Sequence, residues 1–167
     1  INRAAHRVVE QGKVPFLERG AETILKSVYK KTLFLSEDKK IIRQSRYIIV
    51  TIGTGADRHL NPEFSLIKEL VDEMLPHLNS SQHLILRSTL FPGTTKKIRD
   101  YLKQRKIKCI VTFCPERIAQ GYAIQELERF PQIIGCFRPE DGLDAARLFK
   151  KITKKMIYLN PLEAELS

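Results

Sequence analysis

Short apolar runs alternate along this chain with longer stretches in which apolar residues recur every three or four positions. Runs at residues 47–52, 84–86 and 108–113 have the length and the β-branched content of buried strands. The run at 47–52 is apolar on both faces, as strands of a parallel sheet are when helices cover both sides. Weaker strands are predicted at residues 32–35, 132–137 and 156–159.

The helical spacing predicts helices at residues 2–11, 21–31, 36–43, 64–78, 94–105, 121–128 and 139–152, with one more helix from Pro161 onward. Ser36, and either Thr94 or Thr95, are typical N-cap residues for two of them. Because strands and helices alternate, the sequence predicts an α/β fold with a doubly wound parallel sheet. No linker is long enough to divide the chain, so we expect one domain.

Polar side chains follow three of the predicted strands at their carboxyl ends. Residues 51–54 lie at the end of the first strand, Ser88 and Thr89 follow the second, and Glu116 and Arg117 follow the third. In an open α/β sheet, ligands bind outside the carboxyl ends of the strands, so these groups are expected to meet at one edge. Gly53 would allow a ligand to approach the backbone closely.

Each of these polar residues has two possible roles. The hydroxyl groups of Thr54 and Thr89 can hydrogen-bond to a ribose, an amide or a phosphate, but threonine is also common in turns. Glu116 can act as a general base or orient a water molecule. Alternatively, it forms a surface ion pair with Arg117 or a lysine, which contributes only ~0 to 1 kcal/mol to stability.

The composition of the 167 residues is that of a globular domain, with 43% hydrophobic and 29% charged residues. No apolar run approaches the roughly 20 residues of a membrane span. The net charge of +10 raises the alternative of a nucleic-acid-binding domain. The lysine pairs are scattered, however, and no zinc-finger spacing or aromatic RNA motif accompanies them. We therefore favour a solvated basic surface with some attraction for anions.

The cysteines and histidines do not indicate a metal site. Cys109, Cys114 and Cys136 have no zinc-site spacing, and the four histidines are dispersed. Cys109 and Cys114 are expected on opposite faces of one strand, where they cannot pair. An odd cysteine count without a secretion signal indicates a reducing, cytoplasmic location. All three thiols are expected to act as small buried hydrophobic groups.

Several ordered segments resemble one known family over essentially the whole chain. They are residues 12–20, 47–55, 88–94 (Ser-Thr-Leu-Phe-Pro-Gly-Thr), 114–123 (Cys-Pro-Glu-Arg-Ile-Ala-Gln-Gly-Tyr-Ala), 131–135 (Pro-Gln-Ile-Ile-Gly) and 162–166. Together they are similar to the UDP-glucose/GDP-mannose dehydrogenase family. The resemblance implies a Rossmann-like domain and an NAD-dependent oxidation of a UDP-sugar 6-hydroxyl to a carboxylate, with UDP-N-acetylhexosamine or UDP-glucose as substrate.

The resemblance also implies roles for individual residues. Gly53, Thr54, Ser88 and Thr89 match cofactor-binding positions, and Thr89 lies near the reacting end of the cofactor. Glu116 matches the glutamate that supports hydrolysis of a thioester intermediate, a role that suits a carboxylate which can activate water. No metal is implied. Gln120 stands where UDP-glucose enzymes usually carry a second glutamate, which favours UDP-N-acetylhexosamines.

The resemblance places other parts of such an enzyme outside this sequence. The glycine-rich fingerprint would precede Ile1, and the catalytic cysteine and the segments that form a homodimer would follow Ser167. Residues 1–160 would then be a partial NAD-binding domain, and 161–167 would begin the helix to a central domain. A non-catalytic Rossmann-like nucleotide-binding module is the alternative to the enzyme.

The expected sheet therefore lacks its first two strands. In the strand order 3-2-1-4-5-6, these strands lie between residues 32–35 and 47–52. Their absence would leave backbone groups unpaired. We therefore expect that this chain does not fold alone as a normal monomer, and that either a longer polypeptide or another chain fills the gap.

Overall fold

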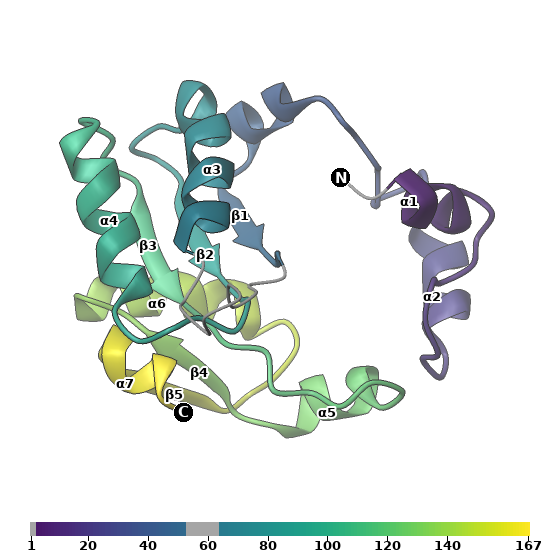
Figure 1. Cartoon of the computed structure of the whole chain (residues 1–167). Helices are drawn as coiled ribbons and strands as arrows, with labels where there is room; N and C mark the ends of the chain where they lie inside the picture. Colours follow the sequence, from purple (N-terminus) through teal and green to yellow (C-terminus); the bar gives the residue numbers. More distant parts are fainter. Residues whose placement is uncertain (1–2, 53–63) are drawn as a thin grey trace, which may run out of the picture. The chain divides into compact units, whose positions relative to one another are not determined.

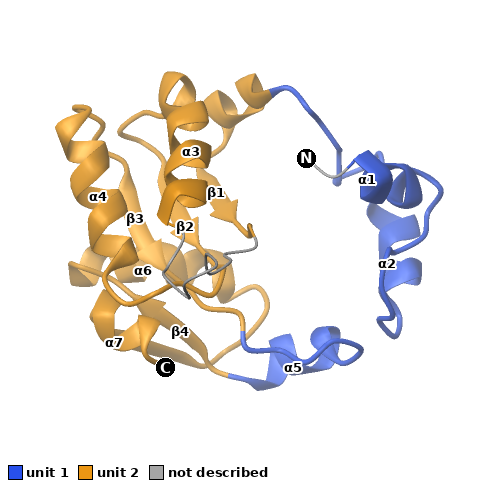
Figure 2. Ribbon diagram, viewed as in Figure 1, with its two compact units in different colours: residues 1–38, 117–130 blue, residues 39–116, 131–167 orange. Residues whose placement is uncertain are grey.

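The computed structural model describes residues 3–52 and 64–167 (Figure 1). The chain forms two compact units, shown in Figure 2: Ile1–Asp38 with Arg117–Phe130, and Lys39–Glu116 with Pro131–Ser167. This division was not expected from the sequence, because no flexible linker marks it. The first unit is assembled from two separate segments, and sequence composition gives no signal for such an arrangement.

The second unit contains a five-stranded sheet in the order β1-β2-β3-β4-β5. The strands are β1 (Tyr47–Val50), β2 (His83–Leu86), β3 (Ile110–Phe113), β4 (Gln132–Gly135) and β5 (Met156–Leu159). β1, β2 and β3 are parallel to one another, and β4 is parallel to β5. β3 and β4 are antiparallel, through the pair Phe113 and Gly135.

The predicted α/β class is confirmed, but the prediction of an entirely parallel sheet is wrong. Between β3 and β4 the chain passes through the other unit, where it forms α5 (Ala123–Arg129). No helix therefore carries the chain back across the sheet, as a parallel connection requires. β4 starts at the edge where β3 ends. An apolar run has no direction, so the sequence pattern could not reveal this reversal.

Helices cover both faces of the sheet. They are α3 (Phe64–Met74), α4 (Thr94–Gln104), α6 (Pro139–Phe149) and α7 (Pro161–Glu165), with short 3₁₀ helices η1 (Lys39–Gln44) and η2 (Leu75–His77). Leu84 and Leu86 of β2 are buried in a cluster with residues of α3, α4 and α7. Ile85 points to the opposite face, where it packs with α6. The alternation along β2 follows the two-residue period of a strand.

The first unit is small and has few buried residues. It consists of α1 (Arg3–Glu10), α2 (Ala21–Val28) and α5. Leu25 is buried, and the buried carboxylate of Glu18 accepts hydrogen bonds from the backbone N–H groups of Gly121 (3.0 Å) and Ile124 (3.4 Å). These bonds tie the loop before α2 to the start of α5.

The strand predicted at residues 32–35 is wrong, because this segment forms only one bridge, between Tyr29 and Leu33. Residues 32–35 lie in the first unit and are not paired with β1, whose neighbour in the sheet is β2. A strand without a partner leaves its backbone groups to the solvent and is not stable by itself. The expectation that two missing strands would lie between residues 32–35 and 47–52 stays a prediction.

Two predicted N-caps are also wrong. The N-cap of α4 is Gly93, which has a φ of +87°, and Thr94 and Thr95 are the first residues of the helix. The Ser36 hydroxyl accepts a hydrogen bond from the backbone N–H of Asp38, and the helix that follows is the 3₁₀ helix η1. Pro76 explains why α3 stops at Met74, since proline cannot continue an α-helix.

Within residues 3–52 and 64–167, none of the helices has the length and apolar character needed to cross a membrane.

A buried polar network joins α6 to the sheet. The ring of His83, on β2, lies 2.9 Å from Asp144 through Nδ1 and 2.8 Å from the Thr112 hydroxyl through Nε2. An ionised carboxylate only accepts hydrogen bonds, so Nδ1–H donates to Asp144 and Nε2 accepts from Thr112. Arg46 adds a 2.6 Å ion pair to Asp144.

The two titratable groups of this network have shifted pKa values. Burial lowers the pKa of His83, although Asp144 opposes this shift. Burial alone would raise the pKa of Asp144, but hydrogen bonds from His83 and Arg46 outweigh it and lower that pKa. The folded protein therefore holds a neutral imidazole beside an ionised carboxylate.

We expect the free energy of unfolding to fall as pH drops below 6.5, the ordinary pKa of histidine. Unfolded His83 binds a proton there, whereas folded His83 binds it only at lower pH, so the slope reaches about 1.4 kcal/mol per pH unit. Urea unfolding between pH 8 and 5 measures the slope. His83→Gln should flatten it, and His6→Gln on α1 should not. If the free energy of unfolding changed with pH in the same way for the unchanged protein and for His83→Gln, this account would be contradicted.

Candidate functional site

The carboxyl ends of β1, β2 and β3 lie at one edge of the sheet, because these strands are parallel. This edge carries Arg87, Ser88 and Thr89 after β2, and Cys114 and Glu116 after β3. The predicted convergence of the second and third polar groups is therefore confirmed. Gly53 and Thr54 lie outside the described residues.

Arg87 connects the residues of this edge. Its guanidinium donates to the carbonyl oxygen of Cys114 (3.2 Å) and to Oε1 of Gln132 (2.9 Å), and it forms an ion pair with Glu116. The guanidinium carbon lies 5.1 Å from the centre of the Phe149 ring. The Arg87 side chain is only 10% exposed, so its charge depends on these partners for solvation.

The sequence left open an ion pair of Glu116 with Arg117 or a lysine, and the structure shows an ion pair of Glu116 with Arg87. The Glu116 side chain is 33% exposed, so the carboxylate remains within reach of solvent. Arg87 holds this carboxylate at the edge where Ser88 and Thr89 also lie. A fixed, solvent-accessible carboxylate has the placement that a general base or a water-orienting group requires.

Ser88 has a buried hydroxyl group without a hydrogen-bond partner. Unsatisfied buried hydroxyls are rare in folded proteins, and each costs about 1 to 3 kcal/mol. Thr89, the next residue, is exposed. A bound molecule that hydrogen-bonds to Ser88 would remove this cost. The Ser88 hydroxyl is therefore the described atom that most directly indicates a ligand at this edge.

The turn after Thr89 is held by α7. The carboxylate of Glu165 accepts hydrogen bonds from the backbone N–H of Gly93 (2.6 Å), the backbone N–H of Thr95 (2.7 Å) and the Thr95 hydroxyl (2.6 Å). A carboxylate at the start of α4 also interacts favourably with the helix dipole. Glu165 thus fixes the helix that ends this turn.

The thiols have no catalytic character in this unit. Burial raises the pKa of Cys114 to about 12 and that of Cys109 to about 11, so both stay protonated. Cys136 is partly exposed, and all three cysteines are free. The expected role as small buried groups is confirmed for Cys109 and Cys114. The described residues contain no cluster of three metal-ligating side chains.

Arg87 and Gln132 were not identified from the sequence. A signal for Arg87 was present, since a charged residue that ends a buried strand must have a partner. Gln132 gave no signal, because it approaches this edge only through the antiparallel direction of β4. A parallel β4 would have placed it at the other end of the sheet.

Comparison with known proteins identifies related sequences. A model described as the UDP-glucose/GDP-mannose dehydrogenase family, NAD binding domain, matches residues 1–153. The UDP-N-acetyl-D-mannosamine dehydrogenase of Methanococcus vannielii is 26% identical over 156 residues, which are 90% of this chain and 35% of that protein. The corresponding protein of Methanococcus maripaludis is 25% identical, and this chain covers 37% of it. The chain thus spans little more than a third of these relatives.

Solved structures show the same fold. The UDP-D-ManNAc dehydrogenase of Pyrococcus horikoshii superposes with a TM-score of 0.92 at 21% identity, over 99% of this chain and 41% of that one. GDP-mannose dehydrogenase of Pseudomonas aeruginosa gives a TM-score of 0.84 at 20% identity, again over 99% of this chain and 41% of that one. The Rossmann-like fold expected from the sequence is confirmed.

We expect Arg87→Met to lower the free energy of unfolding by about 2 kcal/mol, because it leaves Glu116 and two oxygen acceptors without their donor. Urea unfolding measures the loss. Arg147→Met is the matched control, since the Arg147 side chain is 72% exposed and its ion pair with Asp144 is 3.4 Å long. It should cost less than about 0.5 kcal/mol. Equal losses for both variants would show that Arg87 does not organise this edge.

Proposed function

Because the chain belongs to the UDP-glucose/GDP-mannose dehydrogenase family, through its NAD-binding domain, we propose that it is the cofactor-binding part of a nucleotide-sugar 6-dehydrogenase. NAD is the cofactor of this domain. The proposed enzyme oxidises the 6-hydroxyl of a UDP-sugar to a carboxylate. The observation that carries the proposal is the match to the family model together with the unpartnered Ser88 hydroxyl at the sheet edge.

The described residues of the edge fit NAD. The hydroxyls of Ser88 and Thr89 can hydrogen-bond to the amide, ribose or phosphate groups of the cofactor. We include Gly53 and Thr54 in the same site as a proposal that rests on sequence alone. When bound, NAD supplies the acceptor for the hydride that leaves the substrate. The contribution of this chain is to bind and orient the cofactor.

Glu116 is proposed to act on water. Its carboxylate is partly exposed and held by Arg87, so it can accept a proton from a water molecule placed at the edge. The ion pair limits the directions in which the carboxylate can point. Arg87 therefore positions Glu116, while Thr89 is proposed to lie beside the reacting end of the cofactor.

The substrate is proposed to be a UDP-N-acetylhexosamine, with UDP-glucose as the alternative. Gln120 supports the preference for a UDP-N-acetylhexosamine over UDP-glucose. The relatives from Methanococcus are called UDP-N-acetyl-D-mannosamine dehydrogenases. A homodimer formed through segments after residue 167 remains a proposal. So does a cytoplasmic location, which the three free cysteines support.

A non-catalytic nucleotide-binding module is the second candidate. It is supported by the unpartnered Ser88 hydroxyl, which indicates a bound ligand without indicating a reaction. NAD reduction with UDP-N-acetylmannosamine, UDP-N-acetylglucosamine and UDP-glucose, measured on a polypeptide that also carries the segments expected before residue 1 and after residue 167, separates the two candidates. Reduction with any of these sugars supports the dehydrogenase. NAD binding without reduction supports the module.

Cofactor binding gives a direct test of the edge. In a polypeptide that also carries the glycine-rich segment expected before residue 1, we expect NAD⁺ to bind, and Ser88→Ala to weaken binding about three- to tenfold through the loss of one hydrogen bond. Isothermal titration calorimetry measures both affinities. Ser81→Ala is the matched control, because Ser81 is exposed and precedes β2 at the opposite edge of the sheet. No binding of NAD⁺, or unchanged binding by Ser88→Ala, would contradict the proposed site.

A further inference from the structure

The reversal of β4 creates a second edge at which parallel strands end. β4 and β5 are parallel to each other and opposed to the other strands. The last residue of β4, Gly135, pairs with the last residue of β3, Phe113, so the chain that follows Gly135 runs back toward the start of β3. α6 follows β4 and α7 follows β5 directly. In α/β sheets, ligand-binding crevices lie outside the ends of such strands.

The two helices leave this edge toward opposite faces of the sheet. Ala145 and Ala146 of α6 pack with Ile134, whereas Ala164 of α7 packs in the cluster that contains Ile133. Ile133 and Ile134 are successive residues of β4 and therefore point to opposite faces. A crevice opens where neighbouring strands send their connections to different sides of the sheet. The second edge has this arrangement.

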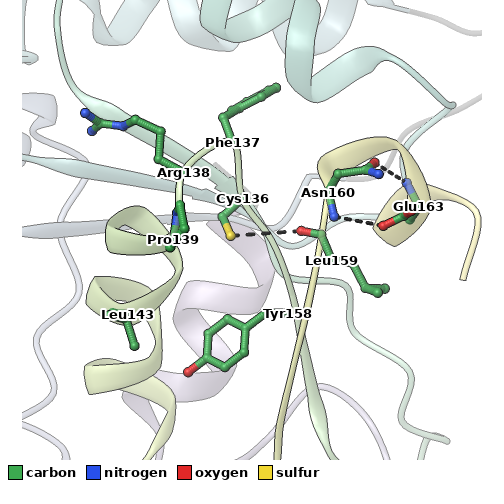
Figure 3. Close-up of a pocket in the computed structure, with 9 residues that line it drawn as sticks. All are labelled: Cys136, Phe137, Arg138, Pro139, Leu143, Tyr158, Leu159, Asn160 and Glu163. Carbon is green, nitrogen blue, oxygen red and sulfur yellow. Dashed lines mark hydrogen bonds between the residues drawn. The ribbon is translucent and has the colours of Figure 1, made fainter.

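A cavity of about 510 Å³ lies at this position, within the size range of small-molecule sites. Figure 3 shows Pro139 and Leu143 of α6 on one side, Leu159 and Asn160 on the other, and Tyr158 between the two elements. The side chains of Asn160 and Glu163 hydrogen-bond to the backbone at the start of α7, so their polar groups are already engaged. Most of the remaining lining is apolar.

A basic cavity of about 290 Å³ adjoins the first, because Phe137 and Arg138 line both. It carries Arg99, Lys103 and Lys108 on its other walls. The Arg99 guanidinium lies 3.6 Å from the centre of the Phe137 ring, over the residue that the cavities share. The one acidic residue that lines this basic cavity, Asp141, is in a 2.7 Å ion pair with Arg138, and Arg99 is in a 3.2 Å ion pair with the neighbouring Asp100. Lys103 and Lys108 are the other cations of the lining, and they can attract an anion.

We propose that this second edge binds an organic anion that carries a flat apolar ring, as a nucleoside phosphate does. The ring occupies the apolar crevice between Leu143, Tyr158 and Leu159. The anionic group lies over the basic cavity near Lys103 and Lys108. This site is separate from the proposed NAD site, since its lining residues lie in α4, near the start of β3, or at and after the ends of β4 and β5, whereas the proposed NAD site follows the ends of β2 and β3.

Photolabelling with 8-azidoadenosine 5′-monophosphate tests the proposal. After irradiation, proteolysis and mass spectrometry locate the labelled peptides. We expect label within residues 136–163. Unlabelled AMP should prevent labelling at a concentration about tenfold lower than adenosine, which lacks the anionic group. Label confined to residues 87–116 would overturn this proposal and leave the proposed NAD site intact.

Variants of the apolar crevice give an independent check. Leu143→Trp should fill the cavity and abolish labelling, and Leu143 is 55% exposed, so the larger ring does not disturb the core. Leu162→Trp is the matched control, because Leu162 is 51% exposed on α7 and does not line the cavity. Equal labelling of both variants would overturn the proposal. So would labelling that declines as protein concentration rises, since another copy of the chain would then cover the crevice.

The charge requirement is tested separately. Lys103→Glu with Lys108→Glu should weaken AMP binding about tenfold, because two charges that attract the anion become charges that repel it. Lys150→Glu with Lys154→Glu makes the same change in net charge outside the cavity and should leave the affinity unchanged. Equal effects of the two pairs would show a general response to net charge and would overturn the assignment.

Discussion

The antiparallel contact between β3 and β4 determines where the strand ends of this protein lie. It separates the sheet into three strands that run in one direction and two that run in the other, with the last residues of β3 and β4 paired. Gly135 makes the contact possible. A Cβ atom on Gly135 would lie 2.7 Å from the Ala164 Cβ and 3.3 Å from the carbonyl oxygen of Phe113, so α7 and β3 can approach this position together only when no side chain is present. The same close packing brings Glu165 to the start of α4, next to the turn that follows Thr89.

The reversal also explains why Arg87 can be buried. A guanidinium with a side chain only 10% exposed is stable where several acceptors surround it. Cys114 and Glu116 come from β3, which is parallel to β2, but Gln132 is available only because β4 begins at this edge. The direction of β4 thus supplies the last hydrogen-bond acceptor for the buried Arg87 guanidinium. That charge in turn holds the carboxylate to which we assign the handling of water.

The sequence predicted the local elements well and their mutual arrangement less well. The strands at β1, β2 and β3 were identified because apolar runs report burial directly, and the hydroxyl and carboxylate groups after β2 and β3 were identified because polar residues at strand ends stand out. The direction of β4, the division into two units and the partner of Glu116 depend on contacts between distant segments. Neither periodicity nor spacing contains that information. The Gly93 N-cap was missed for another reason: the capping carboxylate, Glu165, lies about 70 residues away.

Two buried polar groups of this sheet show how structure and function can be separated. His83 is almost completely buried, yet both ring nitrogens have partners, so its network needs nothing further and serves to join α6 to the sheet. Ser88 lies two residues beyond the end of the same strand, and its buried hydroxyl has no partner. Evolution of a stable fold alone would favour an apolar residue at such a position, because an unsatisfied hydroxyl lowers stability. This contrast is why we propose that the partner of the Ser88 hydroxyl is a group of the bound ligand.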